Sequence, residues 1–196
     1  MRQKQLLFTG VCLLLLATGC TRPASSGAAS SDTTSPPMTV ADSATVRTGL
    51  TVTATGYGSL RVGMTVRDAA TALGSPVPSM VGLDTACAYV KFDNQPAGMR
   101  IMVVRGNVAR LEIDSASIAT GLGARVGDPE SRVKDLYGSR VVVQPHKYDP
   151  SGHYLIVNPI PPTDTGFALV FETDSGRVTK YRAGRTPEVE WVEGCS

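Results

Sequence analysis

The sequence has few of the residues on which catalysis usually depends. Its 196 residues include two histidines, His146 and His153, both within the stretch PHKYDPSGHYL. Asp149 and Ser151 lie between them, so this stretch could offer a serine, histidine and aspartate set, although such sets are rarely built on one loop. His146, Asp149 and His153 could instead bind zinc, but their spacing matches no strong metal motif. We interpret the stretch as a polar connection between strands, and we predict no catalytic residue, no metal site and no cofactor.

The sequence also lacks a marked excess of charge. It has 19 basic and 17 acidic residues. Arg2 and Lys4 belong to an N-terminal segment that we expect to be removed, which leaves no net charge on the remaining chain. Nucleic-acid binding and polybasic membrane contacts both need a concentrated positive field. The composition therefore argues against both.

A third absence is a hydrophobic run long enough to span a bilayer, which takes roughly 20 residues. The apolar stretch from residue 6 to 17 follows a basic N-terminus and is typical of a secretory signal peptide, predicted over residues 1–19. It ends in Ala17-Thr18-Gly19-Cys20, which resembles a bacterial lipobox. The resemblance implies lipidation of Cys20 and a lipid anchor in the cell envelope. Thr21, in place of an aspartate, favours the outer membrane, facing the periplasm. Ordinary secretion, with Cys20 left as a free thiol, is the alternative.

The segment after Cys20 has little capacity to fold. Of residues 21–48, 21 are Ser, Thr, Ala, Pro or Gly, and none is aromatic. Such a segment buries too little apolar surface to offset its conformational entropy. We predict a disordered tether over residues 20–48 and one folded unit over residues 49–196.

Cysteine is scarce but informative. Cys12 leaves with the signal peptide and Cys20 is the predicted lipidation site, so Cys87 and Cys195 are the cysteines that remain in the folded unit. Two cysteines in an exported domain most simply form a disulfide bond. We therefore predict a Cys87–Cys195 disulfide, since the spacing of a reactive CxxC pair is absent.

One pattern occurs twice in the folded unit. The segments RVGMTVRDAATALGS (61–75) and RVGDPESRVKDLYGS (125–139) share their ends at a constant offset. Each middle predicts a short helix, begun by Thr65 with Asp68 in the first and by Asp128 with Pro129 in the second.

Strand patterns follow each predicted helix. They cover residues 87–93, 99–104 and 107–114 after the first helix, and 153–158, 167–173 and 177–183 after the second, with a final edge strand at 188–195. The pattern predicts an α+β fold, a tandem repeat of a short helix followed by a three-stranded antiparallel meander, over residues 49–121 and 122–196.

This arrangement resembles the SmpA/OmlA family of small outer-membrane lipoproteins. The resemblance rests on Gly63-Met64-Thr65 and Leu73-Gly74 in the first segment, and on Gly127 and Gly138 in the second. The duplicated unit is also similar to the β-lactamase-inhibitor protein fold. The family resemblance implies an accessory of the β-barrel assembly machinery.

We expect from these observations a non-enzymatic envelope lipoprotein that faces the periplasm and binds another envelope protein. The alternative is an inhibitor of an envelope or secreted enzyme that acts through its sheet surface. An inhibitor should gather aromatic or acidic side chains on that surface.

Overall fold

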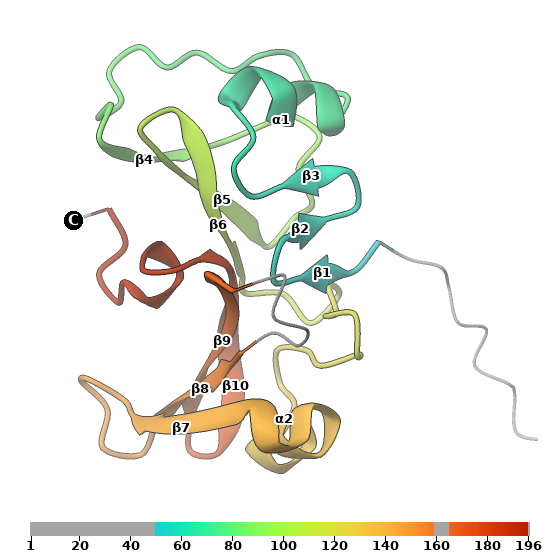
Figure 1. Cartoon of the computed structure of the whole chain (residues 1–196), viewed down its shortest axis with the longest axis vertical. Coiled ribbons are helices and arrows are strands. Elements are labelled where there is room, and N and C mark those ends of the chain that lie inside the picture. The colour runs from blue at the N-terminus through green and yellow to red at the C-terminus, as the bar shows by residue number, and fades with distance from the viewer. Residues whose placement is uncertain (1–49, 159–164, 196) are drawn as a thin grey trace, which may run out of the picture. The chain divides into compact units, whose positions relative to one another are not determined.

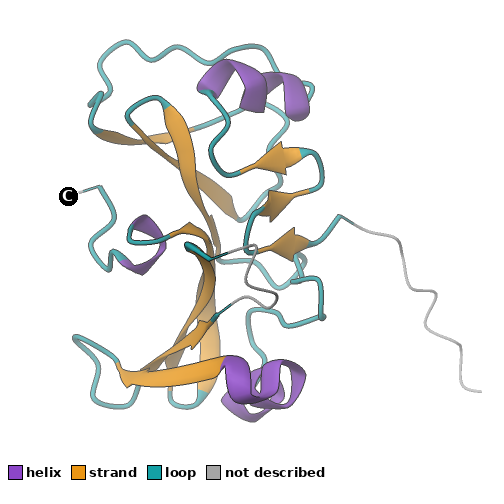
Figure 2. Cartoon of the chain, in the orientation of Figure 1, coloured by secondary structure: helices purple, strands orange, loops and turns teal. Residues whose placement is uncertain are grey.

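The computed structural model describes residues 50–158 and 165–195. Within these ranges the chain is mostly β-structure, as Figure 2 shows, with two short α-helices and two 3-10 helices. The predicted signal peptide, the lipidation site Cys20 and the tether over 20–48 lie outside the described residues. Among the residues described, no helix is both long and apolar enough to cross a membrane.

Seven strands form one continuous antiparallel sheet. They are β4 (Cys87–Val90), β5 (Met99–Val104), β6 (Asn107–Ile113), β7 (Val141–Pro145), β8 (His153–Val157), β9 (Phe167–Asp174) and β10 (Arg177–Arg185). Their spatial order is β4-β5-β6-β10-β9-β8-β7, so β10 has three strands on each side. β10 pairs with β6 through Tyr181 opposite Ile113 and with β9 through Tyr181 opposite Phe171. Strands from the two halves of the chain thus share one sheet.

A second, smaller sheet precedes the first helix. It consists of β1 (Val52–Thr53), β2 (Gly56–Tyr57) and β3 (Leu60–Arg61), in that order. Gly56 has a φ of 155°, and an added Cβ there would lie 2.1 Å from the carbonyl oxygen of Leu60. The close approach of β2 to β3 therefore requires glycine at this position.

The two α-helices begin differently. α1 (Val66–Ala72) starts as predicted, because the Thr65 hydroxyl accepts a hydrogen bond from the backbone of Asp68 at 3.2 Å. α2 (Glu130–Tyr137) begins later than predicted, since Pro129 occupies the N-cap position. The Asp128 carboxylate instead accepts a hydrogen bond from the backbone of Arg125. The 3-10 helices are η1 (Gly138–Arg140) and η3 (Glu188–Glu190).

The main core lies between one face of the seven-stranded sheet and a layer made of α1, α2 and the small sheet (Figure 1). At its centre the Phe171 ring packs 5.8 Å from that of Tyr137 and 5.4 Å from that of Tyr181. The buried Tyr181 hydroxyl donates to the carbonyl oxygen of Ile118 at 3.1 Å, so its polar end is satisfied.

The predicted tandem repeat of a helix followed by a three-stranded meander is wrong. The chain is mostly β, with a seven-stranded and a three-stranded antiparallel sheet and two short helices in the described residues. No strand was predicted from the sequence at the positions of β1, β2, β3 or β7. It also assigned an edge strand to 188–195, where the chain forms η3 and then an irregular segment. Instead of pairing with a strand, backbone carbonyls of this segment accept hydrogen bonds from the side chains of Arg110 and Arg182.

Candidate functional site

Charged side chains cross the face of the sheet that is turned away from the main core. We call this the polar face and define it by Arg100, Arg110, Glu112, Glu172, Lys180 and Arg182, from β5, β6, β9 and β10. Alternation along each strand places them there, because their neighbours in sequence, such as Leu111 and Tyr181, enter the core. Register places opposite charges side by side, with Arg100 opposite Glu112 and Lys180 opposite Glu172.

Glu112 is the centre of the first cluster. Its carboxylate accepts hydrogen bonds from Arg100 Nε at 3.0 Å and from Arg110 Nε at 2.9 Å. The Tyr89 hydroxyl donates to it as well. Burial alone would raise the pKa of Glu112. The charge of Arg110 and the hydrogen bonds from Tyr89 and Arg100 lower it by more, so this pKa lies below its ordinary value of 4.5.

Glu172 is the centre of the second cluster. Lys180 Nζ lies 3.0 Å from its Oε1, and His146 Nε2 lies 3.2 Å from the same oxygen. Arg182 Nη2 is more distant, at 3.6 Å from Oε2. Burial would raise the pKa of Glu172, but the hydrogen bonds from Lys180 and His146 outweigh it and hold the pKa below its ordinary range.

A C-terminal segment covers part of the polar face. This strap, residues 188–195, lies on the opposite side of the sheet from α1 and α2 (Figure 1). Arg110 Nη1 donates to the carbonyl oxygens of Glu188 at 2.8 Å and Trp191 at 2.6 Å. Arg182 Nη1 donates to the same Trp191 oxygen at 2.9 Å. Two buried arginines therefore hold the backbone of the strap against the sheet.

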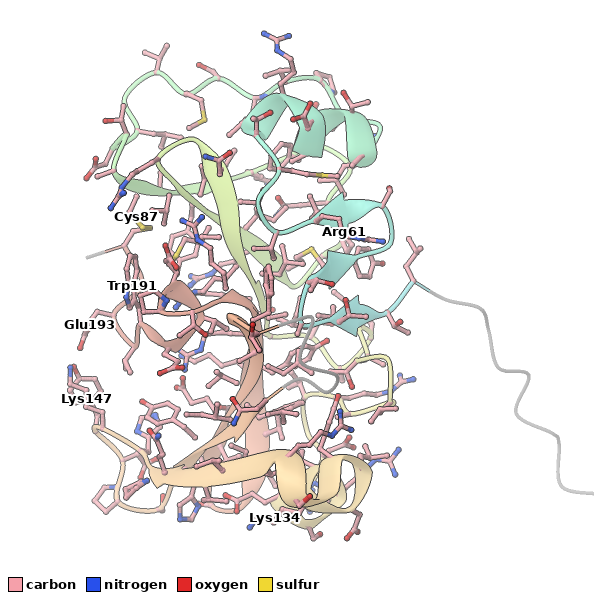
Figure 3. The ribbon with its side chains drawn as sticks, in the orientation of Figure 1. Arg61, Cys87, Lys134, Lys147, Trp191 and Glu193 are labelled. Atoms are coloured by element: carbon pink, nitrogen blue, oxygen red, sulfur yellow. A yellow bond between two sulfur atoms is a disulfide. The ribbon has the colours of Figure 1, made fainter. Side chains whose placement is uncertain are left out.

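The end of the strap is joined covalently to the edge of the sheet. Cys87 in β4 and Cys195 form a disulfide with their Cα atoms 5.3 Å apart. Figure 3 shows Cys87, Trp191 and Glu193 on the same side of the molecule as Lys147, and Arg61 on the other side. Glu193 of the strap pairs with Lys147 at 3.1 Å, which links the strap to the loop after β7.

Between strap and sheet lies a cavity of about 230 Å³. Its lining comes from β4, β5, β6, β10 and the strap, and consists of Tyr89, Arg100, Arg110, Glu112, Lys180, Arg182, Val192, Glu193 and Gly194. Gly194 has a φ of 71°, and an added Cβ would lie 2.6 Å from the Tyr89 hydroxyl. Glycine thus lets the strap pass close over Tyr89.

The loop with the two histidines does not assemble a catalytic set. His146 Nδ1 accepts the backbone N–H of Asp149 at 2.9 Å, while the Ser151 hydroxyl bonds to the carboxylates of Asp149 and Asp174. His153 lies apart from them and contacts Glu130 at 2.8 Å. In the described part of the chain, no three His, Cys, Asp or Glu side chains are grouped to hold a metal.

Four aromatic side chains from the second half of the chain, which could in principle stack against a ligand, are dispersed. Tyr181 belongs to the main core, and Tyr154 is buried on the opposite face, where its ring stacks on His146 at 4.6 Å. Tyr148 and Trp191 are exposed. In the sequence, Arg110 and Glu112 alternate with Ala109, Leu111 and Ile113, which is typical of a strand with one solvated face. Both are buried, because the strap covers them.

Stability should fall in acid because of these clusters. Glu112 and Glu172 both have lowered pKa values in the folded protein, so as the pH falls the unfolded chain takes up protons first. Their contribution is present above the ordinary value of 4.5 and is lost as the pH falls through the folded values. Urea unfolding midpoints measured over a pH series should therefore decline below that value.

The variant Glu112→Gln supplies the control for this pH series. It removes one of the two groups, so its midpoint should fall less steeply with decreasing pH. A decline that is identical in both proteins would contradict the assignment of the acid sensitivity to Glu112.

Comparisons with known proteins assign the chain to no family. No protein-family model matches the chain. No curated protein matches it by sequence either. The solved structures that match include two described here. One is the uncharacterized protein yfeY from Escherichia coli, with 13% identity over 69% of this chain and 99% of that chain and a TM-score of 0.39. The other is an extracellular protein containing a SCP domain from Bacillus anthracis str. Ames, with 9% identity over 64% of this chain and 44% of that chain and a TM-score of 0.40. Neither likeness carries an inference about function.

Proposed function

We propose that the protein is a lipid-anchored envelope protein that works by binding, without catalysis, and that an extended segment of another envelope protein pairs with β7. The observation that carries this proposal is the unpaired outer edge of β7. It is the last strand of the seven-stranded sheet and pairs on one side with β8, while no other described strand pairs with its outer side. Its outward backbone groups can therefore receive a further strand.

The side chains of β7 favour such pairing. Val142 is 47% exposed and Val143 is 44% exposed, although they point to opposite faces of the strand. Edge strands are usually protected by charged residues, bulges or proline. Here the sequence VVVQP has no charge, and its proline comes at the end. Two exposed β-branched residues on a free edge therefore suit the addition of a partner strand.

Charges around β7 indicate the chemistry of the partner. Arg140 precedes the strand, while Lys147, which follows it, already pairs with Glu193. An extended apolar segment with an acidic residue at the end that meets Arg140 would match this surface. The lipobox-like ATGC and the Ser/Thr-rich segment after it support an anchored, tethered domain that can reach partners near the membrane.

The alternative of an enzyme inhibitor receives less support. It requires aromatic or acidic side chains gathered on the sheet surface. On the polar face the exposed side chains are Arg100 and Lys180, which are basic.

Crosslinking in cells tests the proposal. A photoreactive amino acid at position 142 should capture one envelope protein, identified by mass spectrometry, whereas the same group at position 81 should not. Val81 is a matched control because it is 93% exposed but lies in a loop. Val143→Asp should reduce the capture at position 142 by about tenfold, since a charge opposes strand addition.

Other outcomes would overturn it. Equal capture from positions 142 and 81 would mean nonspecific contact. Adducts between two copies of the chain would mean that β7 pairs with itself and not with another protein. The Cys20→Ala variant tests the anchor separately, because it should move the protein out of the membrane fraction.

A further inference from the structure

The cavity beneath the strap contains more positive charge than its own carboxylates neutralise. Four cationic side chains line it, namely Arg100, Arg110, Lys180 and Arg182. The carboxylates that pair with them are two, Glu112 and Glu172. Glu193 also lines the cavity, but it pairs with Lys147 in an exposed position. The lining and the side chains that pair with it, Lys147 and Glu172 included, thus have five positive and three negative charges, an excess of two.

The hydrogen-bond donors of Arg110 are already used within the protein. A guanidinium has five N–H donors. Arg110 directs its donors to the Glu112 carboxylate, to the Tyr89 hydroxyl and to the strap carbonyls. Its role is to hold the strap in place.

Arg182 has capacity to spare. It is 2% exposed, yet one hydrogen bond, to Trp191, is found for its side chain among the described residues. Its Nε is buried without a partner, and Nη2 lies 3.6 Å from Glu172, too far for a hydrogen bond. Burial and the neighbouring charge of Arg110 lower the pKa of Arg182. A buried guanidinium with unused donors is costly unless an anion satisfies it.

Two further donors stand at the rim of the same cavity. Lys180 and Arg100 each bond to a single carboxylate, Glu172 and Glu112 respectively, and both keep exposed ends. The volume of about 230 Å³ exceeds the roughly 30 Å³ that one water occupies, so a group of several heavy atoms can enter.

We propose that this cavity binds a phosphate group, held by Arg182 at its floor and by Lys180 and Arg100 at its rim. Phosphate suits the site because guanidinium groups bind its oxygens in a fork geometry. A phosphate monoester carries about −1.5 to −2 charges at pH 7, which matches the excess of two positive charges. This site is separate from β7 and does not depend on the function proposed above.

Calorimetric titration of the full chain tests the proposal with two probes, inorganic phosphate and glycerol 3-phosphate. Both rim variants, Lys180→Gln and Arg100→Gln, should weaken binding about tenfold, since each removes a charge-assisted hydrogen bond. Arg67→Gln is the matched control, because Arg67 is exposed on α1 away from the cavity and should leave binding unchanged. Circular dichroism of each variant checks that the fold is retained.

The two probes also identify the source of the phosphate. Tighter binding of glycerol 3-phosphate would indicate a phosphate ester such as a lipid headgroup, and equal or tighter binding of inorganic phosphate would indicate the free ion. Absence of heat for both probes at millimolar concentration would overturn the proposal. So would an equal loss of binding in Arg67→Gln and the rim variants.

Discussion

Glu112→Gln should lower the free energy of unfolding by about 3–5 kcal/mol, the usual result of removing one partner from a buried ion pair. Glu112 accepts hydrogen bonds from Arg110, which is 2% exposed, so solvent can do little to replace the lost charge. The neutral amide keeps the size of the side chain, so the loss reflects charge and not packing. Urea denaturation of both proteins, monitored by circular dichroism, measures the difference.

An exposed ion pair provides the matched control for this prediction. Glu193→Gln breaks the Lys147–Glu193 pair, whose side chains are both about half exposed. Such pairs contribute roughly 0–1 kcal/mol, so the variant should unfold close to the wild type. A loss as small in Glu112→Gln as in Glu193→Gln would mean that the buried cluster adds nothing to stability.

Replacing Cys87 and Cys195 together with alanine should lower the free energy of unfolding by about 2–4 kcal/mol. The two residues are 108 positions apart in the chain, so the bond restricts a long loop of the unfolded state. It also holds the strap whose Val189 is fully buried. Thermal unfolding of the double variant gives the size of the effect.

Peptide mapping without reductant complements this measurement. It should recover a peptide in which Cys87 is joined to Cys195. Free thiols at both positions in the native protein, or a double variant as stable as the wild type, would contradict the structural role of the bond.

Local structure was largely predictable from the sequence. The strand pattern at 99–104 corresponds to β5, and that at 107–114 to β6. Thr65 caps α1 as its hydroxyl and spacing to Asp68 indicate. These features depend on neighbouring residues, which is why a local pattern can specify them.

Long-range arrangement was not predictable in the same way. Matching segments around the two helices suggested equal units, but pairing of β6 with β10 depends on residues about 70 positions apart, such as Ile113 and Tyr181. The three valines of β7 (141–143) did offer a signal, since a run of β-branched residues favours a strand. That these valines lie on a free edge follows only from the order of the strands in the sheet.

The candidate site was the least predictable part. Arg110 and Arg182 look like ordinary solvated residues of alternating strands in the sequence. They are buried because residues 188–195 cross over them, and no local pattern connects those segments. The sequence offered the distant Cys87 and Cys195 as a sign that the C-terminal segment returns to the sheet.

The central position of β10 affects when the sheet can fold during synthesis of the chain. A growing chain that stops before residue 177 has β4–β6 and β7–β9 but lacks the strand that joins them. In that state β6 and β9 would each present an unpaired edge with apolar residues, which invites association with other chains. Cotranslational folding can therefore yield only two open fragments, and the finished sheet must await release of the last residues. Export before folding would deliver all seven strands together and avoid that exposed intermediate.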